Sequence, residues 1–202
     1  MPLNITLLPS KDQTRIKNFA EELPKALEKA RNQVNGGSAA AKLLLWFGGS
    51  DNATKIEIRD KLAKLRTFVM NHNVQCRLRL DRPADENALA DHVTGGIIGG
   101  GGASSLARLE FARGEFGGLG ILNLSPNFSN LPEYAIGPVS AFGAQDKFQT
   151  VVHELSHIVL GTGDEKLNDG TTAYGGTAAR LLATQDAAKA RNNAENWGMF
   201  VE

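Results

Sequence analysis

Hydrophobic residues recur at helical spacing along the first third of the chain. Residues 11–34 repeat apolar side chains every three or four positions, with charged residues between them, which predicts a helix with one buried face. A second apolar run ends at Phe47, and a third helix is predicted to continue through about Asn71. The pattern therefore predicts a helical N-terminal part over residues 1–73.

After residue 73 the pattern changes from helical to alternating. Residues 74–80 alternate apolar and polar side chains, as a half-buried strand does. Residues 106–112 and 119–124 are interpreted as two more strands. The remainder, residues 74–202, is therefore predicted to hold a small sheet followed by further helices.

An HExxH motif lies in the next apolar segment. On a helix His153 and His157 are four positions apart and lie on one face, so both imidazoles can reach one metal ion. Glu154 lies beside them, placed to hold a water on that metal and accept its proton. Zinc suits this set if a third protein ligand leaves the fourth position open. Without a third ligand, two histidines packed in a core are the alternative interpretation.

Two aspartates downstream are candidates for that third ligand. Gly161 is a helix stop signal, and the chain then turns back, so Asp164 lies one tight turn beyond His157. Asp169 lies further along the same loop, next to Gly170. Because aspartate beside glycine is ordinary turn chemistry, neither position is decided by its residue type alone.

These residues resemble the aspzincins, the deuterolysin-like and peptidyl-Lys metalloendopeptidases, whose signature is HExxH followed by GTxDxxYG. The chain has His153-Glu154-Leu-Ser-His157, Gly161-Thr162-Gly-Asp164 and Tyr174-Gly175. The resemblance implies that His153, His157 and Asp164 are zinc ligands and that Glu154 is the catalytic base. It also implies that the hydroxyl of Tyr174 steadies the oxyanion of the transition state.

The resemblance also implies a fold. Family-like segments occur in the right order over most of the chain. They imply a single zincin-like metallopeptidase domain over residues 1–202 of the α+β class, mainly helical, with a small mixed β-sheet next to the HExxH helix. Residues 1–73 would form its helical N-terminal part, and residues 74–202 its sheet, active-site helix and closing helices.

The spacing after the motif departs from the family pattern. Family members have the aspartate and the tyrosine three positions apart, whereas here residues 165–173 are inserted between Asp164 and Tyr174. Either the loop bulges after Asp164, or Asp169 takes the ligand role. Gly161 and Thr162 precede Asp164 as the signature requires, which favours Asp164 and keeps Asp169 as the alternative.

The closing segment bears on specificity. Family members selective for lysine use an acidic pocket drawn from an Ala-Asp-Asn segment and a second acid three residues after that Asp. Here Ala194-Glu195-Asn196 keeps one acid, and the second position is Gly198. We therefore predict that Glu195 binds substrate with a weakened preference for basic residues. A solvated helix residue is the alternative interpretation of Glu195.

Composition limits the partners and the cellular location that the chain can be expected to have. The 22 basic and 22 acidic residues balance, so no nucleic-acid or membrane footprint is visible. The single cysteine, Cys76, excludes an internal disulfide framework. Neither a secretory signal nor an apolar run of about 20 residues is found. The chain is expected to be soluble, and secreted or delivered by a route without a signal peptide, or cut from a larger polypeptide.

Together these observations predict a zinc-dependent endopeptidase acting on proteins or peptides through a metal-bound water. A bacterial toxin or effector, with an inhibitor or immunity protein as partner, is the further expectation. One alternative is a zinc amidase that hydrolyses cell-wall peptides. The other is a catalytically inactive binding module on the same fold, against which the intact Glu154 argues.

Overall fold

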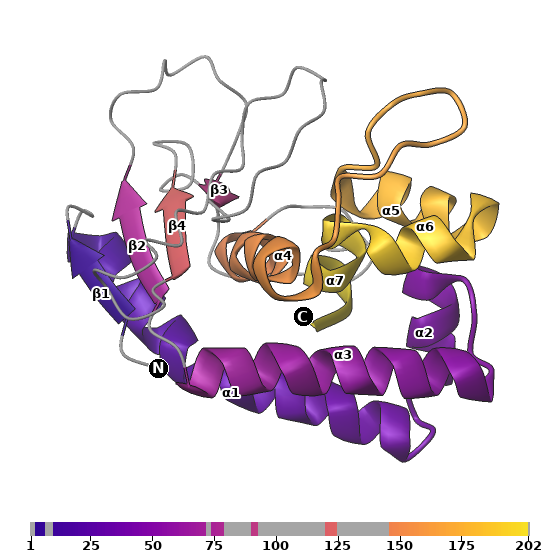
Figure 1. Ribbon diagram of the computed structural model, residues 1–202, viewed down its shortest axis with the longest axis horizontal. Helices are drawn as coiled ribbons and strands as arrows, with labels where there is room; N and C mark the ends of the chain where they lie inside the picture. The colour runs from indigo at the N-terminus through magenta and orange to yellow at the C-terminus, as the bar shows by residue number, and fades with distance from the viewer. Residues whose placement is uncertain are drawn as a thin grey trace.

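The computed structural model describes residues 3–6, 10–71, 74–78, 90–92, 120–124 and 146–201 (Figure 1). In chain order the helices and strands are β1 (Leu3–Thr6), α1 (Ser10–Asn35), α2 (Ala40–Phe47), α3 (Asn52–Asn71), β2 (Val74–Leu78), β3 (Ala90–His92), β4 (Gly120–Leu124), α4 (Lys147–Leu160), α5 (Gly175–Gln185), α6 (Ala187–Asn192) and α7 (Ala194–Val201).

The N-terminal helices follow the predicted pattern. Helix α1 continues through Pro24 to Asn35, and α3 ends at Asn71 as predicted. The two helices lie side by side along one edge of the molecule (Figure 1). Their facing residues form an apolar core with Trp46 and Phe47 of α2. Helices α1 to α3 confirm the helical interpretation of residues 11–71, whereas β1 is a strand that the prediction of a helical part over residues 1–73 missed.

Helix α2 joins the N-terminal helices to the C-terminal ones. It ends at Gly48, whose φ of 68° is in the left-handed region that favours glycine. A β-carbon there would also lie 2.3 Å from the carbonyl oxygen of Ala183, so α5 approaches too closely for any side chain. The rings of Trp197 and Phe200 in α7 pack on Phe47, with centroids 4.8 and 5.0 Å away. The core therefore continues from α2 into α7.

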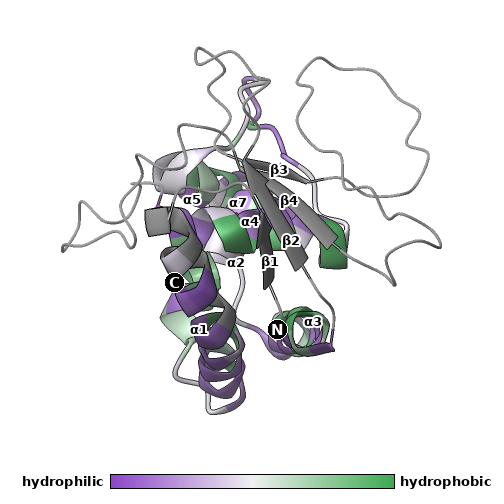
Figure 2. Ribbon diagram, turned by 90° about the vertical axis from the view of Figure 1, so that its left-hand side faces the viewer, coloured by the Kyte–Doolittle hydropathy of each residue, from purple (hydrophilic) through white to green (hydrophobic). Residues whose placement is uncertain are grey.

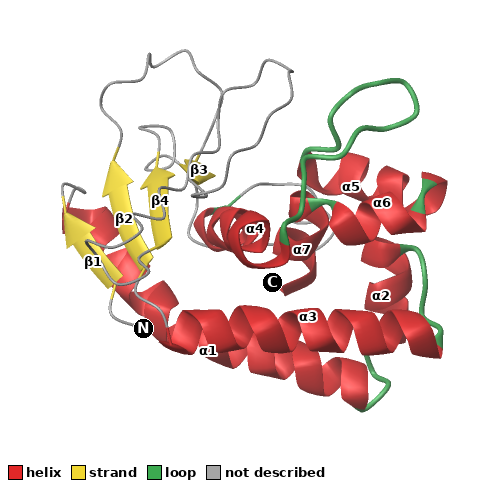
Figure 3. Ribbon diagram, viewed as in Figure 1, coloured by secondary structure: helices red, strands yellow, loops and turns green. Residues whose placement is uncertain are grey.

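The strands form one short sheet in the order β1-β2-β4-β3 (Figure 3). Strands β1, β2 and β4 are parallel, and β3 pairs antiparallel with β4. Of the three strands predicted from the alternating pattern, residues 74–80 and 119–124 correspond to β2 and β4, and residues 106–112 lie outside the described residues. Strand β3 lies next to α4, the helix that carries the HExxH motif.

The predicted α+β class needs correction. All described core residues lie in helices or in the connections beside them, and no residue whose side chain is described belongs to the sheet. The four strands are backbone segments of three to five residues each. The part of the chain that carries the described core and the candidate site is thus helical, because long amphipathic helices supply its apolar area.

The hydropathy of the long helices agrees with their packing. In Figure 2 the long helices show both hydrophobic and hydrophilic segments, as expected where one face packs and the other meets water. Within the described residues, no helix is both long enough and apolar enough to cross a membrane.

Candidate metal centre

Helix α4, which carries the two histidines of the motif, is capped at both ends. Asp146 caps its N-terminus, its Oδ1 accepting the backbone N–H of Gln149 at 2.7 Å. Gly161 ends it with a φ of 68°, a conformation that turns the chain back toward the helix. Between these ends His153 and His157 are both buried, at 8% exposure each. The predicted helix and its predicted stop are confirmed.

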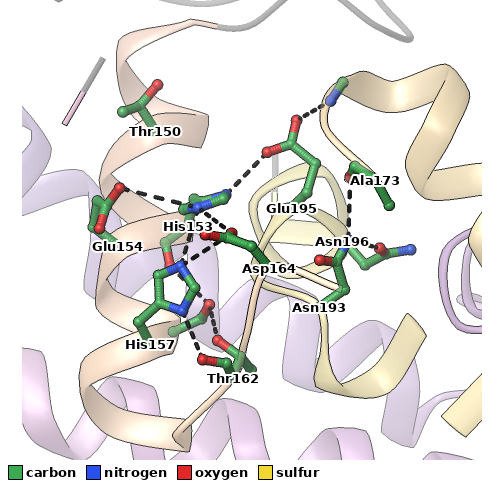
Figure 4. Close-up of polar contacts among 12 residues, drawn as sticks. Thr150, His153, Glu154, His157, Thr162, Asp164, Ala173, Asn193, Glu195 and Asn196 are labelled. Atoms are coloured by element: carbon green, nitrogen blue, oxygen red, sulfur yellow. Dashed lines mark hydrogen bonds and ion pairs between the residues drawn. The ribbon is translucent and has the colours of Figure 1, made fainter. Parts of the chain in front are cut away.

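Three ligand atoms converge beside this helix (Figure 4). The Nε2 atoms of His153 and His157 are 3.2 Å apart, and Oδ1 of Asp164 lies 3.4 Å from each of them. Ligand atoms about 2.0–2.1 Å from a tetrahedral zinc ion lie about 3.3–3.4 Å from one another. Among the described residues this is the one group of three His, Cys, Asp or Glu side chains able to hold a metal ion, and its spacing fits zinc.

Hydrogen bonds on the far side of each ring decide which nitrogen is free. The Nδ1 atom of His157 lies 2.6 Å from the carbonyl oxygen of Thr162, which can only accept a hydrogen bond. The Nδ1 atom of His153 lies 2.9 Å from a carboxylate oxygen of Glu195, also an acceptor. Each Nδ1 therefore carries a proton, and in the neutral rings both Nε2 lone pairs face each other and Asp164. A metal cation between them makes that arrangement favourable, and without one a proton on Nε2 takes its place.

The titration of the site points the same way. Burial lowers the pKa of His153, but the carboxylates of Asp164 and Glu195 outweigh it and the pKa lies well above its ordinary value. Burial raises the pKa of Asp164, but hydrogen bonds from His153 and His157 outweigh it and hold that pKa far below its ordinary range. The carboxylates around the two histidines therefore favour positive charge at the point where the three ligand atoms meet.

The loop after α4 is anchored to the start of α7. Gly163 donates its N–H to the carbonyl of Asn192 at 2.8 Å, and its own carbonyl accepts the N–H of Ala194 at 2.9 Å. The N–H of Glu165 donates to Oδ1 of Asn193 at 2.9 Å. These bonds hold the backbone on both sides of Asp164, so its carboxylate is carried by a fixed segment. Sequence reasoning missed Asn193, because an isolated asparagine carries no signal of its partners.

The insertion after Asp164 closes on itself. The N–H of Ala173 donates to the carbonyl of Glu165 at 2.8 Å, and Lys166 bridges to Thr172 inside that contact. Residues 165–173 thus leave and return at one point, visible as the loop above α5 in Figure 1. Tyr174 is thereby brought back to the site, as if the family spacing were kept. Of the two interpretations left open by the sequence, the structure shows the bulged loop.

Asp169 lies on that bulge and outside the group of ligand atoms. It is exposed, and its Oδ1 accepts both the backbone N–H and the hydroxyl of Thr171, at 2.9 and 2.6 Å. This is the turn chemistry that aspartate beside glycine ordinarily shows. The structure therefore brings Asp164 to the two histidines and does not bring Asp169 to them.

Glu154 and Tyr174 lie on the rim of the group. An oxygen of the buried Glu154 is 4.0 Å from Nε2 of His153. The ring of Tyr174 lies 6.1 Å from that of His153 between centroids, and 46% of the residue is exposed. Partial burial, together with the charge of Asp164, raises the pKa of Tyr174, so its hydroxyl stays protonated and can donate. Both predicted catalytic side chains thus border the ligand atoms.

Glu195 has different surroundings from those predicted. It is fully buried, with one oxygen on His153 and the other accepting the N–H of Gly175 at 2.9 Å (Figure 4). The interpretation as a solvated helix residue is wrong. The contact with a substrate ammonium group stays a prediction, since both oxygens are bonded within the protein.

Comparisons with known proteins agree with this site. A family model described as lysine-specific metallo-endopeptidase, the aspzincin model, matches residues 121–202, which hold every candidate site residue. An extracellular protease from Aeromonas hydrophila is 44% identical over 62 residues, 30% of this chain and 16% of that protein, so the chain spans a small part of its relative. A zinc peptidase from Grifola frondosa has a similar fold, with a TM-score of 0.63 at 19% identity over 96% of both chains.

Proposed function

Because residues 121–202 belong to the aspzincin family, we propose that the protein is a zinc-dependent endopeptidase acting on proteins or peptides. The observation that carries this proposal is the triangle of Nε2, Nε2 and Oδ1 atoms, 3.2–3.4 Å on a side. It matches the three-ligand zinc sites of hydrolases, in which a fourth position stays open.

Each of the described side chains has its own role in the proposed hydrolysis. His153, His157 and Asp164 would hold the zinc ion, which when bound polarises a carbonyl group and makes water more acidic. Glu154, beside the ligands, takes the proton from the attacking water and gives it to the leaving amine. Tyr174 donates its retained proton as a hydrogen bond to the oxygen that becomes negative.

A weakened preference for basic residues is part of the same proposal. Both oxygens of Glu195 already accept hydrogen bonds, which leaves little free charge for a lysine ammonium group. Gly198 occupies the second acidic position of the lysine-selective members. A β-carbon there would lie 2.8 Å from Nε2 of the Gln149 side chain and 2.9 Å from the backbone carbonyl oxygen of Gln149. A second acid therefore has no room there unless Gln149 moves.

Action outside the producing cell is proposed from the Aeromonas hydrophila relative, which is described as extracellular. Delivery as an effector with an inhibitor or immunity partner stays a prediction from the sequence. So does the single domain over residues 1–202. Secretion is tested by assaying the culture medium and the cell lysate of the producing organism for the protein.

The experiment that tests the proposed function combines zinc content with cleavage of denatured casein. The parent should hold about one zinc ion and cleave casein, and Glu154→Gln should keep the zinc and lose about 10²–10⁴-fold in rate. Asp164→Ala should lose both zinc and activity, whereas the matched Asp169→Ala should keep both. A parent that binds zinc and cleaves peptidoglycan but not casein would support the amidase alternative, and one that cleaves neither the binding module.

A further inference from the structure

Glu195 is a buried carboxylate that the proposed mechanism does not use. It is 0% exposed and lies in the first turn of α7, 42 positions after His153. Burying a carboxylate is costly unless hydrogen bonds compensate, so its partners indicate its role. Among the described residues it has two such partners, and both are donors.

The first partner is a metal ligand. Oε2 of Glu195 accepts Nδ1–H of His153 at 2.9 Å, which fixes the proton on Nδ1 and leaves Nε2 free to face Asp164. A carboxylate in this position also makes the imidazole a stronger base and therefore a better ligand. Nδ1 of the other histidine, His157, lies against the neutral carbonyl of Thr162 instead of a carboxylate.

The second partner is the first residue of α5. Oε1 of Glu195 accepts the N–H of Gly175 at 2.9 Å, and the N-cap residue of that helix, Tyr174, makes no side-chain cap. The carboxylate therefore caps α5 from another helix, where negative charge is favourable. Since Gly175 follows Tyr174 directly, this bond also fixes the backbone that carries the Tyr174 hydroxyl.

Helix α7 holds Glu195 rigidly for this task. The neighbouring Asn196 is also fully buried, and its Nδ2 donates to the carbonyl oxygens of Trp46 and Ala179. Asn193, before the helix, bonds to Glu165 and Asn196. The carboxylate is therefore fixed from the protein core rather than presented on a flexible surface segment.

We infer that Glu195 is a positioning residue that joins the metal ligand His153 to the Tyr174 segment, instead of binding the substrate. The inference rests on the proposed function, because it assigns Glu195 a role in that site. One carboxylate sets the free nitrogen of His153 and the position of the Tyr174 backbone together.

Glutamine is the informative replacement, since it keeps the size and removes the second acceptor. Its single carbonyl oxygen can accept a hydrogen bond from His153 or from Gly175, but not from both in the same way as the carboxylate. If the NH₂ group faces Gly175, two donors meet. If it faces His153, Nδ1 of that ring must accept, and the proton moves to Nε2, the nitrogen that should bind the metal. Glu195→Gln should therefore lower zinc affinity about 10–100-fold, the usual cost of losing such a partner. Glu21→Gln, the same change at an exposed residue of α1, is the matched control and should leave zinc affinity unchanged.

Zinc affinity is measured by competition with a chelator, with circular dichroism as a check of folding. In the zinc-loaded parent, the Nδ1–H proton of His153 should give a slowly exchanging, downfield NMR signal. Glu195→Gln should shift or broaden that signal and leave the Nδ1–H signal of His157 in place. A merely structural loss would alter both signals.

Two peptides separate positioning from substrate binding. They differ only in lysine or glutamine on the C-terminal side of the cut. A positioning role predicts that Glu195→Gln lowers kcat/KM by the same factor for both peptides. Unchanged zinc affinity and NMR signals, with a loss confined to the lysine peptide, would overturn the inference in favour of substrate binding.

Two further results are decisive if the main variant or the parent behaves unexpectedly. Should Glu195→Gln not fold, Glu195→Asp keeps the charge on a shorter chain and should bind zinc more weakly than the parent; unchanged affinity would overturn the inference. Should the parent bind zinc but cleave no peptide, the proposed function fails, while the comparison of zinc affinities still decides the role of Glu195.

Discussion

The two halves of the described helical structure both bury apolar side chains, but they differ in how many polar ones they bury. Helices α1 to α3 bury a continuous set of apolar residues, and Thr54 is the one buried polar residue described there. In residues 146–201 the buried polar residues are Asp146, Lys147, Gln149, Thr150, His153, Glu154, Ser156, His157, Thr162, Asn193, Glu195 and Asn196. Both halves gain stability from apolar burial, and the second also uses buried polar groups to fix a site.

Hydrogen bonds offset most of the free-energy cost of burying these polar side chains. Ser156, for example, donates to the carbonyl of His153 and lies 2.8 Å from the hydroxyl of Thr162. Asn193 and Asn196 each bond to more than one backbone or side-chain group. The ligand atoms of His153, His157 and Asp164 are different, because a bound cation is their natural partner. The site half should therefore depend on the metal, and the N-terminal half should not.

Removal of zinc is the strongest test of this difference. A chelator should abolish activity and lower the melting temperature, since a ligand at 100 times its Kd stabilises the folded state by about 2.7 kcal/mol. Hydrogen exchange should rise in residues 146–174 and stay unchanged in the interior of α1 and α3. Equal increases in both halves would contradict the division, and re-addition of zinc is the control for reversibility.

The same contrast explains what the sequence could predict. The apolar repeats of α1 and α3 and the HExxH face of α4 are periodic, so the sequence predicts them directly. The bulged loop that returns Tyr174 to Asp164, and the bonds of Asn193, depend on backbone contacts between distant segments, which no local pattern encodes. The fold class was misjudged because alternation over a few residues predicts a strand but does not show which elements carry the core.

Truncation of the apolar core is expected to have the next largest effect. Leu27 of α1 is 1% exposed, so Leu27→Ala should lower the free energy of unfolding by about 2–5 kcal/mol through lost burial and a cavity. The matched change Leu44→Ala removes a side chain that is 59% exposed and should cost less than about 0.5 kcal/mol. Both are measured by urea unfolding. A large drop in zinc affinity of folded Leu27→Ala would argue against separate tasks for the two halves.

Two buried amides in the site half should respond in opposite directions. Gln149 is 1% exposed, and within the described part of the chain neither of its amide atoms has a hydrogen-bond partner. Gln149→Met should therefore raise the free energy of unfolding by about 1–3 kcal/mol. Asn196→Leu should lower it by about 1–3 kcal/mol, because the carbonyls of Trp46 and Ala179 lose their donor. A destabilised Gln149→Met would show that this amide has a partner in solution.

The smallest effect expected is a pH-dependent one at two exposed aspartates, one in each half. The backbone and hydroxyl hydrogen bonds of Thr54 lower the pKa of Asp51, and those of Thr171 lower the pKa of Asp169. A lowered folded-state pKa means that the stabilisation is present above the unfolded pKa and is lost as the pH falls through the folded one.

Asp51→Ala and Asp169→Ala should each be slightly less stable than the parent at pH 6, and the difference should shrink as the pH is lowered below the ordinary aspartate range. The measurement is urea unfolding of zinc-free protein from pH 6 to pH 3. Asp51 accepts the N–H of Thr54 at the start of α3, whereas Asp169 only closes the bulged loop. The loss should therefore be larger for Asp51, and an equal or larger loss at Asp169 would mean that the bulge contributes to global stability as a helix cap does.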